Sequence, residues 1–278
     1  MKNMILLILK ENRENAQYTC AICARECKKL KDLMEKEILD LLRQQKHADI
    51  NELAARLYIS ASTVRRKLTA LQQKGLVTRT HGGVQINDER DFFPSFTFRS
   101  HQNCLEKKKI ALSAIKLIKS GDLIFLDGST SAFFIAEYLT ECKNIKVVTN
   151  GIDTLSLLSR NKIPAYATGG FISSVNNSVL IGEHAEHTIR QFHADIAFVS
   201  AQSVRSDGEI YDCFEDENVL RNAMCHHSAK SVFLCDSTKF GRSAQYRLCS
   251  LGEFDYMVCD KGINDYFTTS TLPEIIYD

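Results

Sequence analysis

The stretch STVRRKLTALQQKGLVTRTHGG, residues 62–83, joins a run of basic residues to an apolar helical stripe. Val64, Leu68 and Leu71 recur at intervals of four and three residues, which is the spacing of one buried face of a helix. Gly75 follows at a position where helices commonly end in a left-handed residue. The overlapping segment LVTRTHGGVQI has the pattern of two short strands around a turn. We therefore predict a helix followed by a basic hairpin, or wing.

Two shorter amphipathic segments precede this helix. EKEILDLLRQQ (residues 35–45) and DINELAARLYIS (residues 49–60) both place leucine and isoleucine at helical spacing. Three short helices in succession, the last with a basic outer face, are typical of a helix-turn-helix unit. We therefore predict a winged helix-turn-helix domain over residues 34–85.

A basic helix face by itself is usually only solvated. Here, however, hydroxyl and arginine side chains share the start of the third helix, where phosphates and base edges would be met. A basic hairpin also follows directly. We therefore predict that this domain binds double-stranded operator DNA. The predicted contact residues are Ser62, Thr63, Arg65, Arg66, Lys67, Thr69, Arg79 and His81.

Charge is divided unevenly along the chain, although the formal net charge is only +1. Residues 1–84 contain 16 Lys or Arg and 9 Asp or Glu, whereas residues 85–278 contain 19 and 25. A basic front joined to an acidic body is consistent with a nucleic-acid-binding module attached to a domain with another task. With 278 residues, the chain is long enough for each part to bury its own core.

Residues 105–278 alternate between apolar strand patterns and helical patterns. The strand candidates are 123–127, 145–150, 164–170, 194–201, 231–236 and 256–260. Helical segments such as SAFFIAEYL separate most of them, so we predict an α/β domain with a largely parallel sheet. Residues 86–104 have no clean period and contain Pro94, and we predict a linker there.

Several of these strands end in polar or glycine-rich turns, and ligands of such sheets bind beyond the carboxyl ends of the strands. FLDGSTS joins a strand to a helix whose first backbone N–H groups suit a phosphate. VVTNG, ATGG and CDSTKFG end three further strands. One such turn is more often a simple helix cap, but four in one domain favour a site for a polar, anionic small molecule. The predicted effector-binding residues are Asp127, Gly128, Ser129, Thr130, Ser131, Thr149, Asn150, Gly169, Gly170, Asp236 and Lys239.

The segment ELAARLYISASTVRRKLTALQQKGLVTRTHGGV closely resembles the winged helix-turn-helix of the DeoR family of bacterial regulators of sugar metabolism. The resemblance covers residues 35–84 without a gap. One departure is Lys67, because the family usually has Asp after the two arginines. This departure implies an additional phosphate contact in place of the family's local hydrogen bonding.

The resemblance continues over most of residues 106–262. It is carried by EKKKIALSAIKLIKSGDLIFLDGSTSAFFIAEYL, VVTN, GG, SVLIGEHA, DIAFVSA and DSTKFG. It implies a fold similar to the ribose-phosphate isomerase and coenzyme A transferase group, and a phosphorylated sugar or related metabolite as ligand. The family commonly has D-x-G-[ST]-T, whereas here the glycine comes one place earlier, at Gly128. This shift alters the expected geometry of the phosphate loop.

Two function classes remain open. The first is a transcriptional regulator, namely a repressor of a carbohydrate-utilisation operon that a phosphorylated sugar releases from its operator. The alternative is a sugar-phosphate isomerase-like enzyme, which needs a general base; the candidates are Asp127, Asp207, Glu215 and Asp236. No paired acid–base motif accompanies them, and an enzyme does not explain the attached DNA-binding domain. We therefore predict a regulator without enzymatic activity. We also expect a homo-oligomer, since one winged helix would bind a single half-site weakly.

The ten cysteines are scattered through the chain, and neither a secretory signal nor an apolar run of membrane-spanning length is present. These features predict a cytoplasmic protein with reduced thiols, without a membrane partner and without a cofactor. Cys20, Cys23 and Cys27 form one cluster, but no convincing fourth metal ligand follows nearby, so we predict no metal site. Residues 1–33 match nothing in the family, and we expect this leader to be dispensable for DNA binding.

Overall fold

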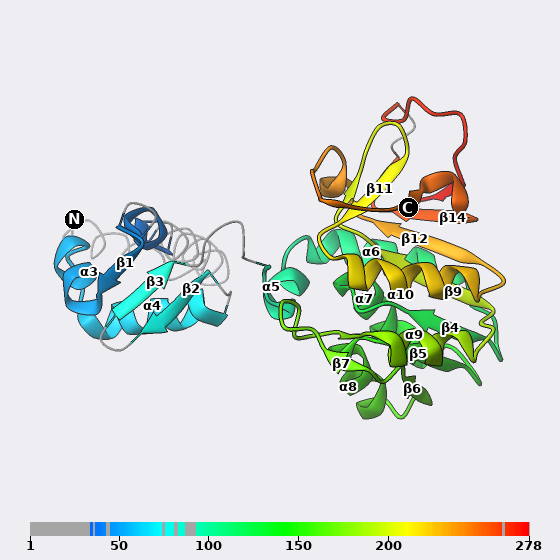
Figure 1. Cartoon of the computed structure of the whole chain (residues 1–278), viewed down its shortest axis with the longest axis horizontal. Helices are drawn as coiled ribbons and strands as arrows, with labels where there is room; N and C mark the ends of the chain where they lie inside the picture. The colour runs from blue at the N-terminus through cyan, green and yellow to red at the C-terminus, as the bar shows by residue number, and fades with distance from the viewer. Residues whose placement is uncertain are drawn as a thin grey trace, which may run out of the picture. The chain divides into compact units, whose positions relative to one another are not determined.

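The computed structural model describes residues 34–35, 37–42, 45–73, 76–80, 83–86, 93–262 and 265–277. The expectations for the leader with its three cysteines, for Gly75 and for His81 lie outside the described residues. The chain divides into two compact units, Met1–Pro94 and Ser95–Asp278, and each is described by itself (Figure 1).

The first unit combines short helices with a small antiparallel sheet. Residues 34–35 and 37–42 are helical. They are followed by β1 (His47–Asp49), α3 (Ile50–Arg56), α4 (Ala61–Gln73), β2 (Val77–Thr80) and β3 (Gly83–Ile86). The strand order is β1-β3-β2, so the predicted two-stranded wing has a third strand that the sequence patterns did not show. The predicted winged helix-turn-helix is confirmed.

The core of this unit contains the stripe predicted for the third helix. Val64, Leu68 and Leu71 of α4 are fully buried, together with Ile38 and Leu42 of the first helical segment. Gly83 stands where β3 passes closest to β1. A Cβ atom there would lie 2.6 Å from the carbonyl oxygen of Ala48, so a side chain would push the wing off β1.

The boundary between the units lies at Pro94–Ser95, inside the expected linker. Ser95 caps helix α5 (Phe96–His101) by accepting a hydrogen bond from the backbone of Phe98. Phe96 is buried, and its ring packs edge-on against that of Phe133, with 5.2 Å between centroids. Residues 95–104 therefore belong to the second unit, because Phe96 anchors them to its core.

The second unit is built on a parallel sheet of seven strands, so the predicted α/β class is confirmed. The strand order is β15-β14-β12-β9-β4-β5-β6. All six predicted strands appear, as β4 (Leu123–Leu126), β5 (Lys146–Thr149), β6 (Ala165–Ala167), β9 (Ile196–Ser200), β12 (Ser231–Cys235) and β14 (Tyr256–Cys259). The edge strand β15 (Glu274–Ile276) was not predicted.

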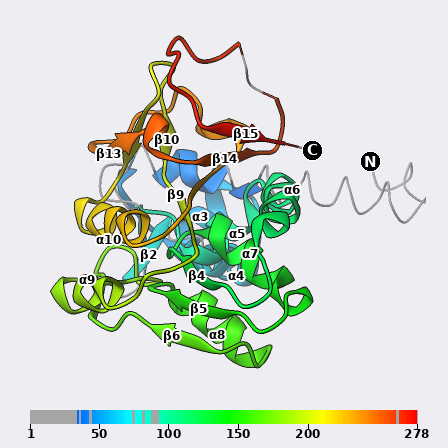
Figure 2. The ribbon, with the colours of Figure 1, turned by 90° about the vertical axis from the view of Figure 1, so that its right-hand side faces the viewer.

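Helices cover both faces of this sheet (Figure 2). One face packs against α6 (Cys104–Ala114), α7 (Thr130–Tyr138) and α8 (Ile152–Arg160). The other face packs against α9 (Glu183–Arg190) and α10 (Glu215–His226). The strands alternate accordingly: in β4, Phe125 faces α9 and α10, whereas Ile124 and Leu126 face α6 and α7.

Two smaller sheets complete the unit. The hairpin of β7 (Phe171–Ile172) and β8 (Leu180–Ile181) follows β6. The strands β10 (Ser203–Val204), β11 (Glu209–Asp212) and β13 (Tyr246–Ser250) form the second small sheet. In the large sheet the chain order reverses between β4 and β9, and ligands of open α/β sheets bind at such a switch point, beyond the carboxyl ends of the strands.

Candidate functional site

The exposed face of α4, the recognition helix, carries most of the predicted DNA contacts. Ser62, Arg65, Arg66 and Thr69 are exposed and fall on one side of the helix, opposite the buried stripe. Thr63 is half-buried at the start of the helix. Ser60 caps this end, since its hydroxyl oxygen accepts a hydrogen bond from the backbone of Thr63 at 3.2 Å.

The wing is fastened to the recognition helix by Arg79 of β2. Its Nη2 atom donates to the backbone oxygen of Arg65 at 2.6 Å and to Oγ1 of Thr69 at 2.7 Å. The residue remains exposed, so it fixes the angle between wing and helix while staying on the surface. Helix and wing together therefore present one polar and basic surface.

Lys67 corrects one part of the prediction. It is not on the open face of the recognition helix: it is buried, and its Nζ atom lies 3.1 Å from Oε1 of Glu35 in the first helical segment. At helical spacing, position 67 falls beside Val64, Leu68 and Leu71 rather than beside Arg66. The exchange from the family's usual acid therefore builds an internal ion pair and does not add a phosphate contact.

In the second unit, the predicted effector residues gather at the carboxyl edge of the large sheet. Asp127 to Ser131 follow β4, Thr149 ends β5 and Asn150 follows it, and Asp236 to Lys239 follow β12. Ser200, which ends β9, connects two of these groups. Its backbone N–H donates to Asp127 at 3.1 Å, and its hydroxyl is 2.6 Å from Nζ of Lys239. Gly169 and Gly170 follow β6 and are exposed, with φ of 70° and 94°.

Asp127 belongs to a buried ionic network, centred on Arg221, that the sequence did not predict. Its Oδ2 atom accepts a hydrogen bond from Nε of Arg221 on α10 at 2.9 Å. Arg221 also pairs with Glu217 at 2.8 Å and with Asp212 at 3.5 Å. Burial disfavours the charge of Arg221, but the three carboxylates outweigh burial and raise the pKa of the guanidinium. Asp127 therefore helps to hold β4, β9 and α10 together at the switch point.

The loop from Asp127 to Ser131 is buried, contrary to what an open phosphate loop would show. Ser129 caps α7 by accepting from the backbone of Ala132 at 3.1 Å. A Cβ atom at Gly128 would lie 2.2 Å from Cγ1 of Val179, so the segment that leads into β8 packs directly on this loop. Glycine at this place, one position earlier than in the family pattern, permits that close packing.

Several buried polar atoms near this loop have no hydrogen-bond partner in the part of the chain that the structure describes. They are Oγ of Ser131, Oδ1 of Asn150 and Oγ1 of Thr154. Buried polar groups are normally paired, and unpaired ones mark a place for a water or a ligand atom. The carboxyl ends of β4 and β5 thus offer one acceptor and two hydroxyls to a polar ligand.

Cationic groups stand at the other end of the predicted site, near Asp236. Lys239 is half-buried beside it, and Lys107 of α6 is buried nearby. Burial, with a contribution from Lys239, lowers the pKa of Lys107 to about 8. Burial would raise the pKa of Asp236, but Lys239 and a hydrogen bond from Thr238 outweigh it, and its pKa lies below the ordinary value. This carboxylate is therefore ionised at neutral pH.

Sequence reasoning missed four residues of this region: Arg99, Asn103, Lys107 and Arg221. Asn103 donates to Asp236 at 3.1 Å and adopts a left-handed conformation with φ of 50°. Lys107 and Arg221 lie in helical segments where a charged side chain is normally solvated. A signal was present for Lys107, because it sits four residues before the buried Ala111 and three before Ile110.

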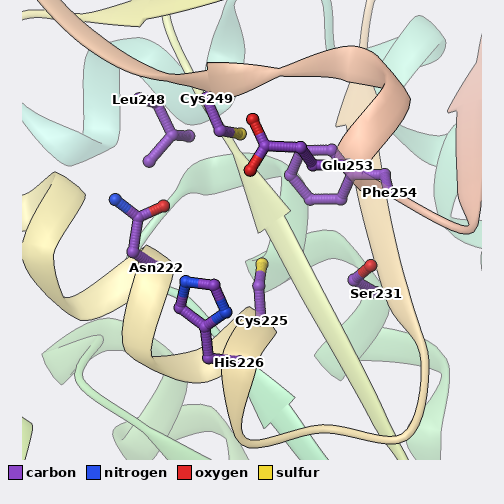
Figure 3. A pocket seen from close by; sticks show the side chains of 8 residues that line it. All are labelled: Asn222, Cys225, His226, Ser231, Leu248, Cys249, Glu253 and Phe254. Atoms are coloured by element: carbon purple, nitrogen blue, oxygen red, sulfur yellow. The ribbon is translucent and has the colours of Figure 1, made fainter. Parts of the chain in front are cut away.

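A separate small cavity of about 70 Å³ lies between α10 and β13 (Figure 3). It is lined by Asn222, Cys225, His226, Ser231, Leu248, Cys249, Glu253 and Phe254. Ser231 begins β12, whereas Asp236 follows the end of that strand, so the cavity is at the opposite end of the sheet from the predicted site. Burial raises the pKa of Cys249 to about 12 and that of Cys225 further still, which keeps both thiols protonated.

Neither a metal site nor a membrane span is evident in the residues that the structure describes. No group of three or more His, Cys, Asp or Glu side chains among them is arranged to hold a metal ion. Among the helices formed by these residues, none combines the length and apolar character needed to cross a bilayer.

Known relatives of the chain are transcriptional regulators. The L-fucose operon activator of Haemophilus influenzae is 30% identical, and the match covers 82% of this chain and 91% of that protein. The transcriptional regulator GolR of Listeria innocua is 30% identical over 83% of this chain and 91% of that protein. The transcriptional repressor AccR of Agrobacterium fabrum is also 30% identical, over 86% and 92%.

Among solved structures, ribose 5-phosphate isomerase A of Methanocaldococcus jannaschii matches with a TM-score of 0.38 and 18% identity, over 50% of this chain and 55% of that chain.

Two family descriptions also match: the DeoR-like helix-turn-helix domain over residues 35–90 and the DeoR C terminal sensor domain over residues 102–261. A helix-turn-helix with a basic face, joined to a sensor domain, is the architecture of a transcriptional regulator, and the chain belongs to the DeoR family.

Proposed function

We propose that this regulator represses a carbohydrate-utilisation operon and leaves its operator when a phosphorylated sugar, or a related metabolite, binds the second unit. The observation that supports this most is the carboxyl edge of the large sheet. There, Lys107 and Lys239 lie near Asp236 after β12, and the unpaired atoms of Ser131 and Asn150 follow β4 and β5 at the same edge. Cations suit a phosphate, and unpaired hydroxyl and amide groups suit the hydroxyls of a sugar.

The DNA-binding half of the proposal rests on the surface formed by the recognition helix and the wing. Arg65, Arg66 and Ser62 are exposed there, and Arg79 fixes the wing against the helix. We propose that these residues, with Thr63 and Thr69, contact the operator, and that a homo-oligomer binds two half-sites. Among the relatives, one is named an operon activator and another a repressor. The sign of regulation is therefore part of the proposal.

The isomerase alternative lacks a suitable base among the four carboxylates considered. Asp127 is paired with Arg221, and the low pKa of Asp236 makes it a weak base. Asp207 pairs with Arg205 on the surface, and Glu215 is exposed at the start of α10. We therefore propose that the site senses its ligand without converting it.

A binding screen tests this proposal directly. The full chain is first given genomic DNA fragments, and the bound fragment defines the operator. Thermal unfolding is then followed with a panel of sugar phosphates, each paired with its unphosphorylated sugar, because a ligand of the folded state raises the unfolding temperature. The proposal expects a shift with at least one sugar phosphate, no shift with its sugar, and weaker operator binding in its presence. Turnover of that sugar phosphate would support the enzyme instead.

A further inference from the structure

The segment of residues 173–180, here called the cover segment, lies over the predicted effector loop. Val179 packs on Gly128. The backbone N–H of Leu180 donates to the oxygen of Asn150 at 2.8 Å, and that of Ile152 donates to Ser178 at 2.9 Å. The cover segment is thus paired with the chain that follows β5, and the loop beneath it is buried. Val179 therefore covers the loop at Gly128, and a ligand that enters on this side has to displace the cover segment.

Asn176, in the middle of the cover segment, is buried and joins two charged residues. Its Oδ1 atom accepts a hydrogen bond from Nη2 of Arg99 on α5 at 3.0 Å, and its Nδ2 atom donates to Oε1 of Glu217 on α10 at 2.8 Å. Its backbone is held as well, since its N–H donates to Ser173 and its oxygen accepts from Val179. The side chain therefore ties the cover segment to two helices at once.

The contacts continue from Asn176 to the effector loop itself. Glu217 accepts from Arg221 at 2.8 Å, and Arg221 donates to Asp127 at 2.9 Å. Asp127 in turn accepts from the backbone of Ser129 in the loop. An unbroken series of buried polar contacts thus runs from the loop to Arg99 on α5.

The end of α5 is held by the same region. Nζ of Lys107 donates to the backbone oxygens of Arg99, at 2.5 Å, and Gln102, at 2.8 Å. Helix α5 is the first helix after the unit boundary at Pro94–Ser95, so its position decides where the chain leaves the second unit. Lys107, which lies near Lys239 and Asp236 of the predicted site, therefore also fixes the end of α5.

We propose that Asn176 is a positioning residue that latches the cover segment to α5, so that displacement of the cover segment by an entering ligand loosens α5. This inference rests on the proposed function, because it describes how binding at that site is passed on. Hydrogen bonds to charged groups contribute more to stability than those between neutral groups. Loss of the two bonds that Asn176 makes to Arg99 and Glu217 therefore releases α5 from the cover segment. A ligand changes this equilibrium by its preference for the displaced cover segment.

Hydrogen exchange of the full chain tests the latch without any ligand. Asn176→Ala removes both side-chain bonds, and Asn177→Ala is the matched control, since Asn177 is the same residue type, next in sequence and exposed. We expect exchange in residues 96–101 to become about tenfold faster in Asn176→Ala and to stay unchanged in the control. Unchanged exchange of α5 in Asn176→Ala, or equal acceleration in both variants, overturns the proposal.

Arg99→Lys weakens the same hydrogen bond from its donor residue, and it replaces Asn176→Ala as the test if that variant does not fold. It keeps the charge but loses the planar donor group that reaches Asn176. We expect faster exchange in residues 173–180, on a different element from the substitution. Exchange there at the wild-type rate contradicts the latch.

A second arm uses glucose 6-phosphate, fructose 6-phosphate and ribose 5-phosphate as probes. In Asn176→Ala, an active probe is expected to bind as tightly as in wild type or more tightly, while its effect on operator affinity falls by at least about threefold. An undiminished effect overturns the latch. If wild type responds to no sugar phosphate, the proposed function fails, and the exchange experiment still decides the latch.

Discussion

Lys67 of the recognition helix forms an ion pair with Glu35, whose Oε1 atom lies 3.1 Å from the lysine Nζ. Only 8% of the Lys67 side chain and 13% of the Glu35 side chain are exposed. Although Lys67 lies in the basic recognition helix, its side chain forms a largely buried ion pair within its own domain. The pair joins the recognition helix to the first helical segment, and this placement separates Lys67 from its neighbours Arg65 and Arg66.

Replacement of Lys67 by alanine is therefore expected to affect folding rather than DNA contact. Lys67→Ala leaves Glu35 largely buried without this partner, which costs about 1–3 kcal/mol of unfolding free energy. Denaturant unfolding measures this loss, and Glu35→Ala in the same chain is expected to recover part of it. The salt dependence of operator binding should stay as in wild type, because no phosphate contact is removed. A slope lowered by about one unit would restore Lys67 as a phosphate contact.

Arg66→Ala is expected to have the opposite profile. Arg66 is exposed on the open face of the recognition helix, so unfolding free energy should change by less than about 0.5 kcal/mol. Operator affinity should fall, and either the salt slope or the preferred operator sequence should change, depending on whether Arg66 meets a phosphate or a base. Salt titration on the operator and on a one-base variant distinguishes the two. Arg56→Ala on α3 is the control, as an exposed arginine paired with Glu52.

Arg79 is expected to act through geometry as well as charge. Arg79→Lys keeps the positive charge, but the lysine side chain is shorter and lacks the rigid guanidinium plane from which Nη2 donates to both Arg65 and Thr69. Operator affinity should therefore fall by about tenfold, since these charge-supported bonds set the angle of the wing. Thr69→Val, which removes one acceptor, should show a smaller loss in the same direction. Wild-type affinity in Arg79→Lys would show that the wing needs only the charge.

The sequence was sufficient to predict the architecture, because the apolar periods of both units are strong. Val64, Leu68 and Leu71 marked the buried face of the recognition helix, and the strand patterns recovered six of the seven strands of the large sheet, from β6 to β14. The strands β1 and β15, of three residues each, were not recovered from the sequence. They are set by pairing with β3 and β14 rather than by local pattern.

The site was predicted less completely than the fold. The turns after β4, β5 and β12 do meet at one edge, as parallel strands require. The sequence could not show that Asp127 would be neutralised by Arg221, 94 residues away, or that Val179 would pack on Gly128. Such contacts depend on which helix covers which face. Lys67, by contrast, was placed on the wrong side of its helix although helical spacing already puts it beside Val64, Leu68 and Leu71.

Ligand binding is expected to depend on pH through Lys107. Burial lowers the pKa of its ammonium from 10.5 to about 8, so the cation that attracts an anionic ligand is lost as the pH rises through 8. A sugar phosphate is fully dianionic in that range, so its own titration does not contribute. Calorimetric affinity for the active sugar phosphate should fall between about pH 7.5 and 9, and Lys107→Arg should remove this decline.

The contribution of Lys107 to the unfolding free energy changes with pH in the opposite direction to its contribution to ligand affinity. Between pH 8 and 10.5 the unfolded chain binds more protons at this residue than the folded chain does, so its contribution to unfolding free energy rises with pH. If ligand affinity falls with rising pH while the unfolding free energy does not, the loss of affinity comes from deprotonation of Lys107 and not from unfolding of the protein. A pH-independent ligand affinity in wild type would contradict the placement of Lys107 in the site.

The most direct test of the account is operator binding by Lys239→Ala, with and without the active sugar phosphate. Removal of a cation within reach of the ligand should weaken ligand binding by about tenfold or more, while operator affinity without ligand is unchanged. The control is Lys109→Ala, an exposed lysine of α6. We expect Lys239→Ala to stay on the operator at sugar phosphate concentrations that release wild type and Lys109→Ala. Release of Lys239→Ala at the wild-type concentration would contradict the site, and loss of operator binding without ligand would show that Lys239 supports the fold instead.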